Sequence, residues 1–297
     1  MTIKIGNAPC SWGVEFADDP RNPDWRRVLD ECALAGYRGI ELGPIGYMPQ
    51  DPGVLTEALA ARGLELIGGV VFRPFHDPGQ WAELKTVAAQ TCRSLAALKA
   101  RHLVLIDSIS PRRAPTAGRP EEAEQLTAAE WKGLVDRVRE ITKLGREEFG
   151  LTASIHPHAA GFIDFERDIE RLFGEIGGGE LELCLDTGHS AYAGFDSLAF
   201  MKKHRDRLVY VHLKDIEPKV KAAVVAKRTD FYKACGQGIF CKLGRGMVDF
   251  GAVRSYLLET HYAGWCTVEQ DCDPAGPTSP LDDARFNRGY LRSIGFQ

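Results

Sequence analysis

The 297-residue sequence lacks an uncharged apolar run of about 18 residues, the length that a membrane-spanning helix needs. It also lacks a basic excess, because 37 Lys and Arg face 41 Asp and Glu and give a formal net charge of -4. Without a basic surface, nucleic acid is not expected as a main partner. The first residues hold one Lys and no long apolar run, which is not the pattern of a secretory signal. We therefore expect a cytoplasmic protein with no membrane partner.

No Cys-x-x-Cys pair occurs among the eight cysteines. Cysteines scattered through a long chain without a secretory signal are expected to stay reduced. Cys184 and Cys266 lie in apolar runs and are predicted to be small buried residues. Cys10, in a Pro-Cys-Ser-Trp-Gly segment, is the best candidate for a reactive thiol, although a structural role is the simpler interpretation.

What the sequence does contain is an alternation of short apolar runs with longer segments of helical period. The runs expected to form strands are 3–7, 39–42, 64–72, 102–106, 151–155, 181–185, 208–213 and 264–270. The segments expected to form helices are 24–35, 52–62, 80–99, 128–149, 164–173, 197–203, 249–260 and 281–293. Because the strand runs are continuously apolar, we expect parallel strands buried on both faces.

Strands and helices in strict alternation predict an α/β fold, a single (β/α)8 TIM barrel over residues 1–297. The alternative is an open doubly wound sheet, which usually has a Gly-rich phosphate loop after its first strand. No such loop follows Ile5. The longest irregular pieces, 107–119 and 216–246, are expected to be loops on the catalytic rim.

In such a barrel the active site lies at the carboxyl ends of the strands. Polar residues end several predicted strands: Glu41, His156-Pro157-His158, Asp186-Thr187-Gly188-His189, His212-Leu213-Lys214-Asp215 and Glu269-Gln270-Asp271. Asp186, His212 and Glu269 offer the oxygen and nitrogen ligands that suit Mn²⁺, Co²⁺, Mg²⁺ or Zn²⁺. Each alone also has a structural interpretation: Asp186 as a turn or helix cap, His212 as a core hydrogen-bonding group, and Glu269 as half of a salt bridge. Together, at one barrel end, they favour a metal site.

The motifs Leu-Asp-Thr-Gly-His (185–189), Val-His-Leu-Lys-Asp (211–215), Gly-Arg-Gly-Met-Val-Asp-Phe (244–250) and Tyr-Ala-Gly-Trp-Cys-Thr-Val-Glu-Gln-Asp (262–271) resemble the xylose isomerase-like superfamily of sugar isomerases and epimerases. Within it, residues 7–13, 156–159 and 284–292 look most like the inosose dehydratases. The resemblance runs from about residue 4 to residue 296.

This resemblance implies that Asp186, His212 and Glu269 are metal ligands. The superfamily's usual fourth ligand is a Glu at the end of the fifth strand, where this sequence has His156. We expect His156 to be the fourth ligand, with Asp164 or Glu166 as the alternative.

The missing carboxylate at the fifth strand also bears on the reaction. A sugar epimerase or isomerase of this superfamily needs carboxylates at the ends of strands five and eight, one to remove a proton and one to return it. Because only Glu269 is present, we expect an elimination of water. By resemblance the substrate is 2-keto-myo-inositol and the metal Mn²⁺ or Co²⁺, and the activity is associated with glutathione, for which the sequence shows no site.

Three alternatives stay open at this point. The chain is a sugar or keto-sugar isomerase or epimerase, a catalytically silent barrel that binds a polyol, or a member of the apurinic-site endonuclease branch. The acidic balance and the small number of histidines, eight, disfavour the endonuclease. The expected partner is a small polyol or keto-sugar, and association into a homo-oligomer is left open.

The expected roles of individual residues are as follows. Glu269, Lys214 and His156 are the candidates for proton transfer, with a salt bridge to Asp215 or Glu217 as the structural alternative for Lys214. Substrate contacts are expected from Glu41, His158, His189 and Trp12. Arg245, where relatives commonly have Glu, either binds an acidic substrate, pairs with a rim carboxylate, or is an exposed loop residue.

Overall fold

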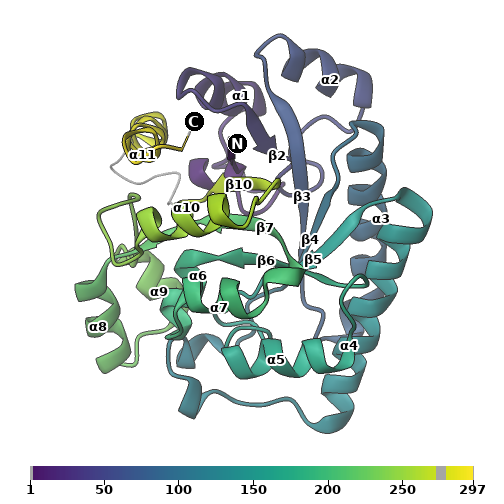
Figure 1. The fold of residues 1–297 in the computed structure, drawn as a ribbon. Helices are drawn as coiled ribbons and strands as arrows, with labels where there is room; N and C mark the ends of the chain where they lie inside the picture. The colour runs from purple at the N-terminus through teal and green to yellow at the C-terminus, as the bar shows by residue number, and fades with distance from the viewer. Residues whose placement is uncertain (1–2, 272–278, 297) are drawn as a thin grey trace.

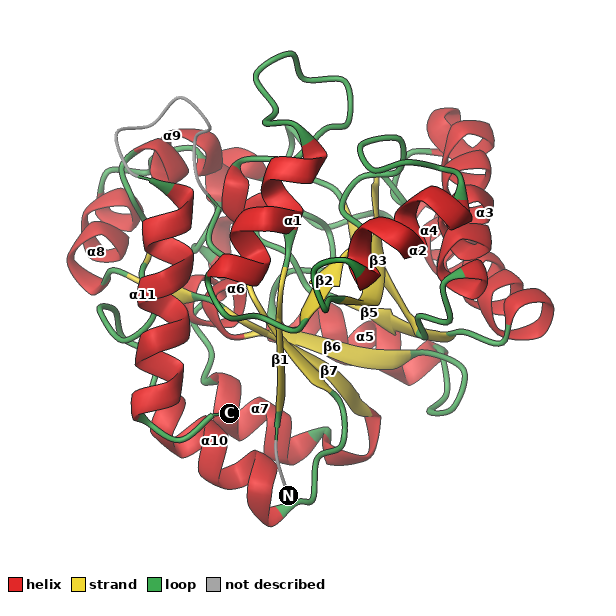
Figure 2. Ribbon diagram, turned by 90° about the horizontal axis from the view of Figure 1, so that it is seen from above, coloured by secondary structure: helices red, strands yellow, loops and turns green. Residues whose placement is uncertain are grey.

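The computed structural model describes residues 3–271 and 279–296. Parallel strands close into a barrel with helices around it (Figures 1 and 2). The barrel strands are β1 (Lys4–Asn7), β2 (Gly39–Glu41), β3 (Glu65–Arg73), β4 (His102–Asp107), β5 (Thr152–Ile155), β6 (Glu182–Asp186), β7 (Leu208–Leu213) and β10 (Trp265–Val268). Their order is β1-β10-β7-β6-β5-β4-β3-β2, and β1 pairs with both β10 and β2 to close the ring. The predicted TIM barrel is confirmed.

The helices are α1 (Trp25–Leu34), α2 (Pro52–Ala60), α3 (Trp81–Ala97), α4 (Ala128–Lys143), α5 (Glu166–Glu175), α6 (Thr187–Ala193), α7 (Ser197–Lys203), α8 (Pro218–Ala226), α9 (Phe231–Gly236), α10 (Phe250–Glu259) and α11 (Pro280–Ser293). Most begin at a side chain that accepts a backbone N–H, as Asp24 does for α1 and Thr127 for α4. In the described part of the chain, no helix has both the length and the apolar character to cross a membrane.

The barrel interior is filled by its own small cluster of apolar side chains, separate from the larger core between strands and helices. This cluster contains Ile67, Val104, Ile106, Cys184 and Tyr210. Glycine on neighbouring strands makes room for it: a Cβ atom on Gly39 would lie 2.6 Å from Ile67 and 2.8 Å from Trp265. Cys184 and Cys266 are buried, as predicted.

Residues 216–246 do not form the long loop that the sequence predicts. They contain α8, α9 and the strand β9 (Phe240–Cys241), which pairs with β8 (Asp215–Ile216) in a separate antiparallel ribbon. The two helices are short, and among the residues of α8 only Val224 is fully buried. Their sequences therefore show little of the three- and four-residue spacing of apolar residues that predicts a helix. Helix α6 begins directly after Asp186 and was not among the predicted helices, although the interpretation of Asp186 as a helix cap is confirmed.

A close backbone contact holds the loop that connects β5 to α5. A Cβ atom on Gly161 would lie 2.4 Å from the carbonyl oxygen of Asp107, at the end of β4. The Asp107 carboxylate accepts the N–H of Phe162 at 2.8 Å, next in the same loop. The loop that carries His158 is therefore fixed to the neighbouring strand end.

We predict that Gly161→Ala destabilises the protein by about 1–3 kcal/mol, because the added methyl group has to displace backbone. Equilibrium denaturant unfolding measures the change. Gly174→Ala, in α5, is the matched control: nothing lies within 4 Å of its added Cβ, and the substitution is expected to stabilise the helix by roughly 0.5 kcal/mol. Equal effects of the two variants would contradict the close contact at Gly161.

Candidate metal and active site

Four buried side chains from four neighbouring strands meet at the carboxyl end of the barrel: His156 after β5, Asp186 at the end of β6, His212 in β7 and Glu269 after β10. One ligand atom from each lies within 4.8 Å of the others. His156 Nε2 is 3.6 Å from Asp186 Oδ2, and His212 Nδ1 is 3.1 Å from Glu269 Oε1. Two imidazoles and two carboxylates thus share one small buried space, which we call the ligand group.

The unpartnered atoms of this group test whether a metal ion fits it. Asp186 Oδ2, His212 Nδ1 and both ring nitrogens of His156 are buried and make no hydrogen bond of good geometry, although they lie close to one another and to Glu269. Buried polar atoms of this kind are rare because each costs desolvation free energy. Imidazole nitrogen and carboxylate oxygen are also the donor set of many divalent-metal sites. The ligand group therefore fits a divalent metal ion.

The protein occupies the other donor atom of two of these side chains. Asp186 Oδ1 accepts the backbone N–H groups of Gly188 and His189 at 2.7 and 2.8 Å, as the cap of α6. His212 Nε2 lies 2.9 Å from Glu41 Oε1. Asp186 Oδ2 and His212 Nδ1 are therefore the atoms left to face the centre of the ligand group.

Lys214 lies beside the ligand group within reach of three carboxylates. Its Nζ is 3.1 Å from Glu269 Oε2, 3.1 Å from Asp271 Oδ2 and 3.6 Å from Asp186 Oδ2. Burial alone would lower the pKa of Lys214, but Asp271, Glu269 and Asp186 raise it well above its ordinary value. Lys214 is thus held as an ammonium group.

The expected alternative partners of Lys214 are engaged elsewhere. Asp215 accepts the backbone N–H groups of Gly244, Gly246 and Val248 at 2.9–3.0 Å, and Glu217 caps α8.

Two neutral imidazoles lie next to Lys214. Burial lowers the pKa of His158 to about 3 and that of His189 well below its ordinary value, and the ring centroids are 4.0 Å apart. His189 Nδ1 accepts the N–H of Ala159 at 3.1 Å, and its Nε2 is 3.1 Å from Lys214 Nζ. The ring of Phe240 is 5.2 Å from His189. An uncharged aromatic wall therefore flanks the ammonium group.

The alternative fourth ligands lie outside the ligand group. Asp164 accepts the N–H of Ala160 at 3.0 Å within its own loop. Glu166 is exposed and pairs with Lys203 at 3.0 Å. His156 is the residue from the end of β5 that the structure brings to the other three.

The structure gives Trp12 and Glu41 partners other than a substrate. Trp12 is buried and its indole N–H donates to Glu31 of α1 at 2.7 Å. Glu41 is buried against His212 and Tyr210. The described contacts of both residues lie within the fold and differ from the substrate contacts expected of them.

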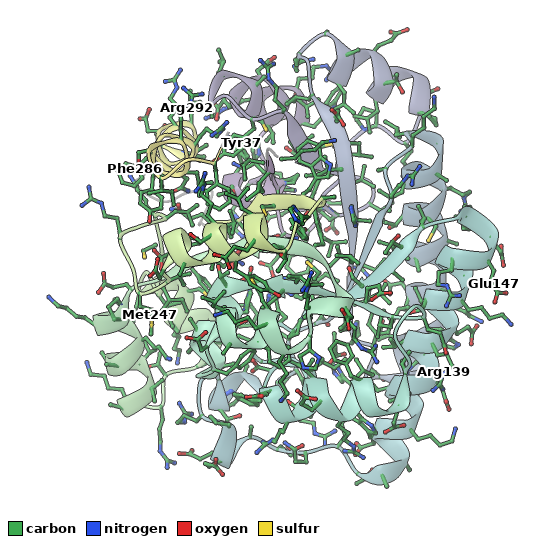
Figure 3. The ribbon with its side chains drawn as sticks, in the orientation of Figure 1. Tyr37, Arg139, Glu147, Met247, Phe286 and Arg292 are labelled. Carbon is green, nitrogen blue, oxygen red and sulfur yellow. The ribbon has the colours of Figure 1, made fainter. Side chains whose placement is uncertain are left out.

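The surroundings of Arg245 and Cys10, two further candidates from the sequence, do not favour a chemical role for either. Arg245 is exposed and its guanidinium lies 5.2 Å from the ring of Phe286, which Figure 3 labels on α11. Burial, followed by the charges of Glu269 and Asp271, raises the pKa of Cys10 well above its ordinary value, which keeps it a thiol and disfavours a nucleophilic role. Seven cysteines are described and all are free of disulfides, while Cys272 lies outside the described residues.

Sequence reasoning missed Tyr210 and Thr267, which lie buried below the ligand group. The signal for them is the period of two along a strand. Tyr210, His212 and Lys214 alternate along the end of β7, and Thr267 and Glu269 do the same at β10. Residues two positions before a candidate ligand therefore point into the same barrel interior.

We predict that His156→Ala weakens binding of Mn²⁺ or Co²⁺ by more than roughly tenfold, because one of four donors is lost. Chelator competition on the purified protein measures the affinity. His158→Ala is the matched control and should leave it unchanged. Unaltered affinity in His156→Ala, together with a loss in Asp164→Ala or Glu166→Ala, would assign the fourth ligand to the carboxylate beyond the loop.

Asp164 also yields a prediction about pH. Burial raises its pKa from 3.8 to about 7, so the folded protein keeps a proton that the unfolded chain loses. This contribution to stability is fully present below about pH 4 and is lost as pH rises to about 7.

Relative to wild type, Asp164→Asn should therefore gain at least about 1 kcal/mol of stability between pH 5 and pH 7, because its amide does not ionise. Denaturant unfolding of both proteins at the two pH values measures the difference. A stability difference that does not change with pH would show that Asp164 is ionised throughout.

Comparison with known proteins agrees with this architecture. The inosose dehydratase of Geobacillus kaustophilus (strain HTA426) is 30% identical over 97% of this chain and 94% of its own length. The rhizopine catabolism protein MocC of Rhizobium meliloti is 32% identical over 98% of this chain and 88% of its own length. The crystal structure of the IOLI protein with a binding zinc atom has the same fold, with a TM-score of 0.75, 14% identity and 98% of each chain covered. The family pattern described as xylose isomerase-like TIM barrel matches residues 29–294, and the chain belongs to that family.

Proposed function

We propose that this chain is a metal-dependent dehydratase that removes water from a cyclic polyhydroxy ketone, with 2-keto-myo-inositol as the favoured substrate. The observation that carries the proposal is the buried ligand group with the Lys214 ammonium placed against two of its carboxylates. Relatives named inosose dehydratase, which align over nearly the whole chain, support both the reaction and the substrate.

The donors for the metal would be His156 Nε2, Asp186 Oδ2, His212 Nδ1 and Glu269 Oε1. A bound divalent ion would supply Lewis acidity to the ketone, which would make the neighbouring C–H bond more acidic. Mn²⁺ and Co²⁺ are the favoured ions. The zinc atom in the IOLI structure belongs to that protein and supports a divalent ion here.

The proton transfers follow from the two oxygens of Glu269. Its Oε1 faces His212, while its Oε2 lies 3.1 Å from Lys214 Nζ. Burial opposes its ionisation, yet His212 and Lys214 hold the pKa of Glu269 well below its ordinary value, so it is a carboxylate, and its Oε2 is the acceptor oxygen that lies beside the Lys214 ammonium group. We assign the base to Glu269 Oε2 and the acid to Lys214.

Glu269 and Lys214 together account for both protons of the elimination. The C–H bond beside the ketone breaks and its proton goes to Glu269 Oε2, while the C–O bond of the β-hydroxyl breaks and the oxygen leaves as water with a proton from Lys214. The electron pair of the C–H bond becomes the new double bond. Because Glu269 Oε2 and Lys214 Nζ are 3.1 Å apart, the proton can pass back to the amine and restore the starting state.

The surroundings suit an uncharged polyol. His158 and His189 are neutral, so they add no charge. His158 Nδ1 donates to the Ala159 carbonyl oxygen and leaves Nε2 as an acceptor, while His189 Nδ1 accepts the Ala159 N–H and leaves Nε2–H as a donor. Phe240 provides an apolar face beside them. An epimerase mechanism, in contrast, needs a second carboxylate at the end of β5, where this chain has His156.

The test is turnover of 2-keto-myo-inositol in D₂O by protein stripped of metal and then reloaded with Mn²⁺ or Co²⁺. We expect a dehydrated dione, identified by mass spectrometry, only after reloading. A product that keeps every hydroxyl but has an inverted or relocated carbonyl centre would identify an isomerase or epimerase. Full turnover after exhaustive chelation would contradict the role of a metal.

Lys214→Met separates the acid from the metal site. Because it removes the proton donor and leaves all four donors in place, we expect kcat to fall by roughly 10²-fold or more while metal content stays that of wild type. Lys219→Met, on the exposed side of α8, is the control and should keep wild-type turnover. Wild-type kcat in Lys214→Met would remove the assignment of the acid.

A further inference from the structure

Three buried side chains form a hydrogen-bonded chain directly against His212. Glu41 Oε1, from β2, lies 2.9 Å from His212 Nε2 and 2.7 Å from the Tyr210 hydroxyl oxygen. The same hydroxyl lies 2.6 Å from Thr267 Oγ1, on β10. Glu41, Tyr210 and Thr267 are each no more than 1% exposed, so water does not compete for these bonds.

The hydrogen bonds to Glu41 Oε1 fix which nitrogen of His212 is used by the fold. Tyr210 donates its O–H to this carboxylate oxygen, and the same oxygen accepts the Nε2–H of His212. Tyr210 oxygen is then left to accept the O–H of Thr267. With Nε2 committed to Glu41, Nδ1 is the nitrogen that His212 presents to the ligand group.

Local features of the barrel bring Glu41 and Tyr210 to these positions. The pairing of β2 with β3 shifts between Ile40 and Glu41, so that Glu41 lies opposite Gly68 instead of Ile67. A Cβ atom on Gly68 would lie 3.2 Å from the carbonyl oxygen of His102 and 3.4 Å from the Tyr210 hydroxyl, so β3 packs closely against both residues here. The ring of His102 stacks on Tyr210 from β4, with centroids 4.6 Å apart and planes 3° from parallel.

We propose that Glu41 and Tyr210 are positioning residues that hold His212 for ligation through Nδ1 and thereby set the affinity of the site for a divalent metal ion. The proposal rests on the metal site put forward above and adds a buried support to it. It assigns Glu41 to the metal side of the site and away from substrate hydroxyls. A carboxylate that accepts the outer N–H of a ligating histidine fixes the ring and raises its basicity, and its loss typically costs roughly 10–100-fold in metal affinity.

The experiment uses Tyr210→Phe and Glu41→Gln, with Co²⁺ as the probe and chelator competition as the measurement. We expect Co²⁺ affinity to fall roughly tenfold or more in both variants, and the visible absorption of the bound Co²⁺ to shift because the His212 ring moves. Tyr262→Phe is the matched control: its hydroxyl is also buried but donates to the backbone oxygens of Trp265 and Val209. It should lose stability while keeping wild-type Co²⁺ affinity and spectrum.

The outcomes separate the two proposals. Wild-type protein that does not bind Co²⁺ overturns the metal site itself. Wild-type protein that binds Co²⁺, with Tyr210→Phe and Glu41→Gln within twofold of it and spectrally identical, overturns the positioning role. If Glu41→Gln does not fold, Tyr210→Phe decides alone, since it removes one oxygen and leaves the ring stacked on His102. A loss of affinity in Tyr262→Phe as large as in Tyr210→Phe would also overturn the proposal, because general loosening of the barrel would then explain both.

Discussion

The excess of buried negative charge at the barrel mouth is the constraint on which the site depends. Asp186, Glu269 and Asp271 lie within 3.6 Å of the Lys214 ammonium group, Glu41 lies against His212, and the neighbouring His158 and His189 are neutral. Buried charge without compensation is costly, and Lys214 alone does not balance the three carboxylates around it. A divalent ion beside Lys214 would remove most of this imbalance. The same charges that would hold the ion also keep the lysine protonated, so the proposed metal site and the proposed acid draw on one electrostatic arrangement.

Much of the fold and the residues of the ligand group could be predicted from the sequence. The apolar runs that end in Asp186, in His212-Leu213-Lys214 and in Glu269 became strands with these residues at their carboxyl ends. The reason is geometric: parallel strands of a barrel bring their carboxyl ends to one rim, so a strand assignment also places the polar residue that follows it. Strand ends predicted to within one or two residues were sufficient to identify the ligand group.

The sequence could not reveal contacts that depend on register and on packing across the barrel. In the sequence, Glu41 does not differ from the other polar residues that end strands. The shifted pairing of β2 with β3 places its side chain against His212 and not at the rim. Trp12 sits in a loop motif whose indole N–H is taken by Glu31 of a helix. The helices of residues 218–236 were missed because a short helix that packs on a small local core needs few apolar residues.

Lys214 and Asp215 are adjacent in the chain but serve different parts of the molecule. Lys214 points to the carboxylates of the site, while Asp215 gathers the backbone N–H groups of the segment 244–248. The end of β7 is thus a common anchor for the ammonium group and for that stretch of the rim. The backbone of residues 244–248 and the Lys214 side chain therefore depend on one short piece of chain. A substitution of Asp215 that freed this backbone is expected to shift the Lys214 ammonium group relative to the carboxylates of the ligand group.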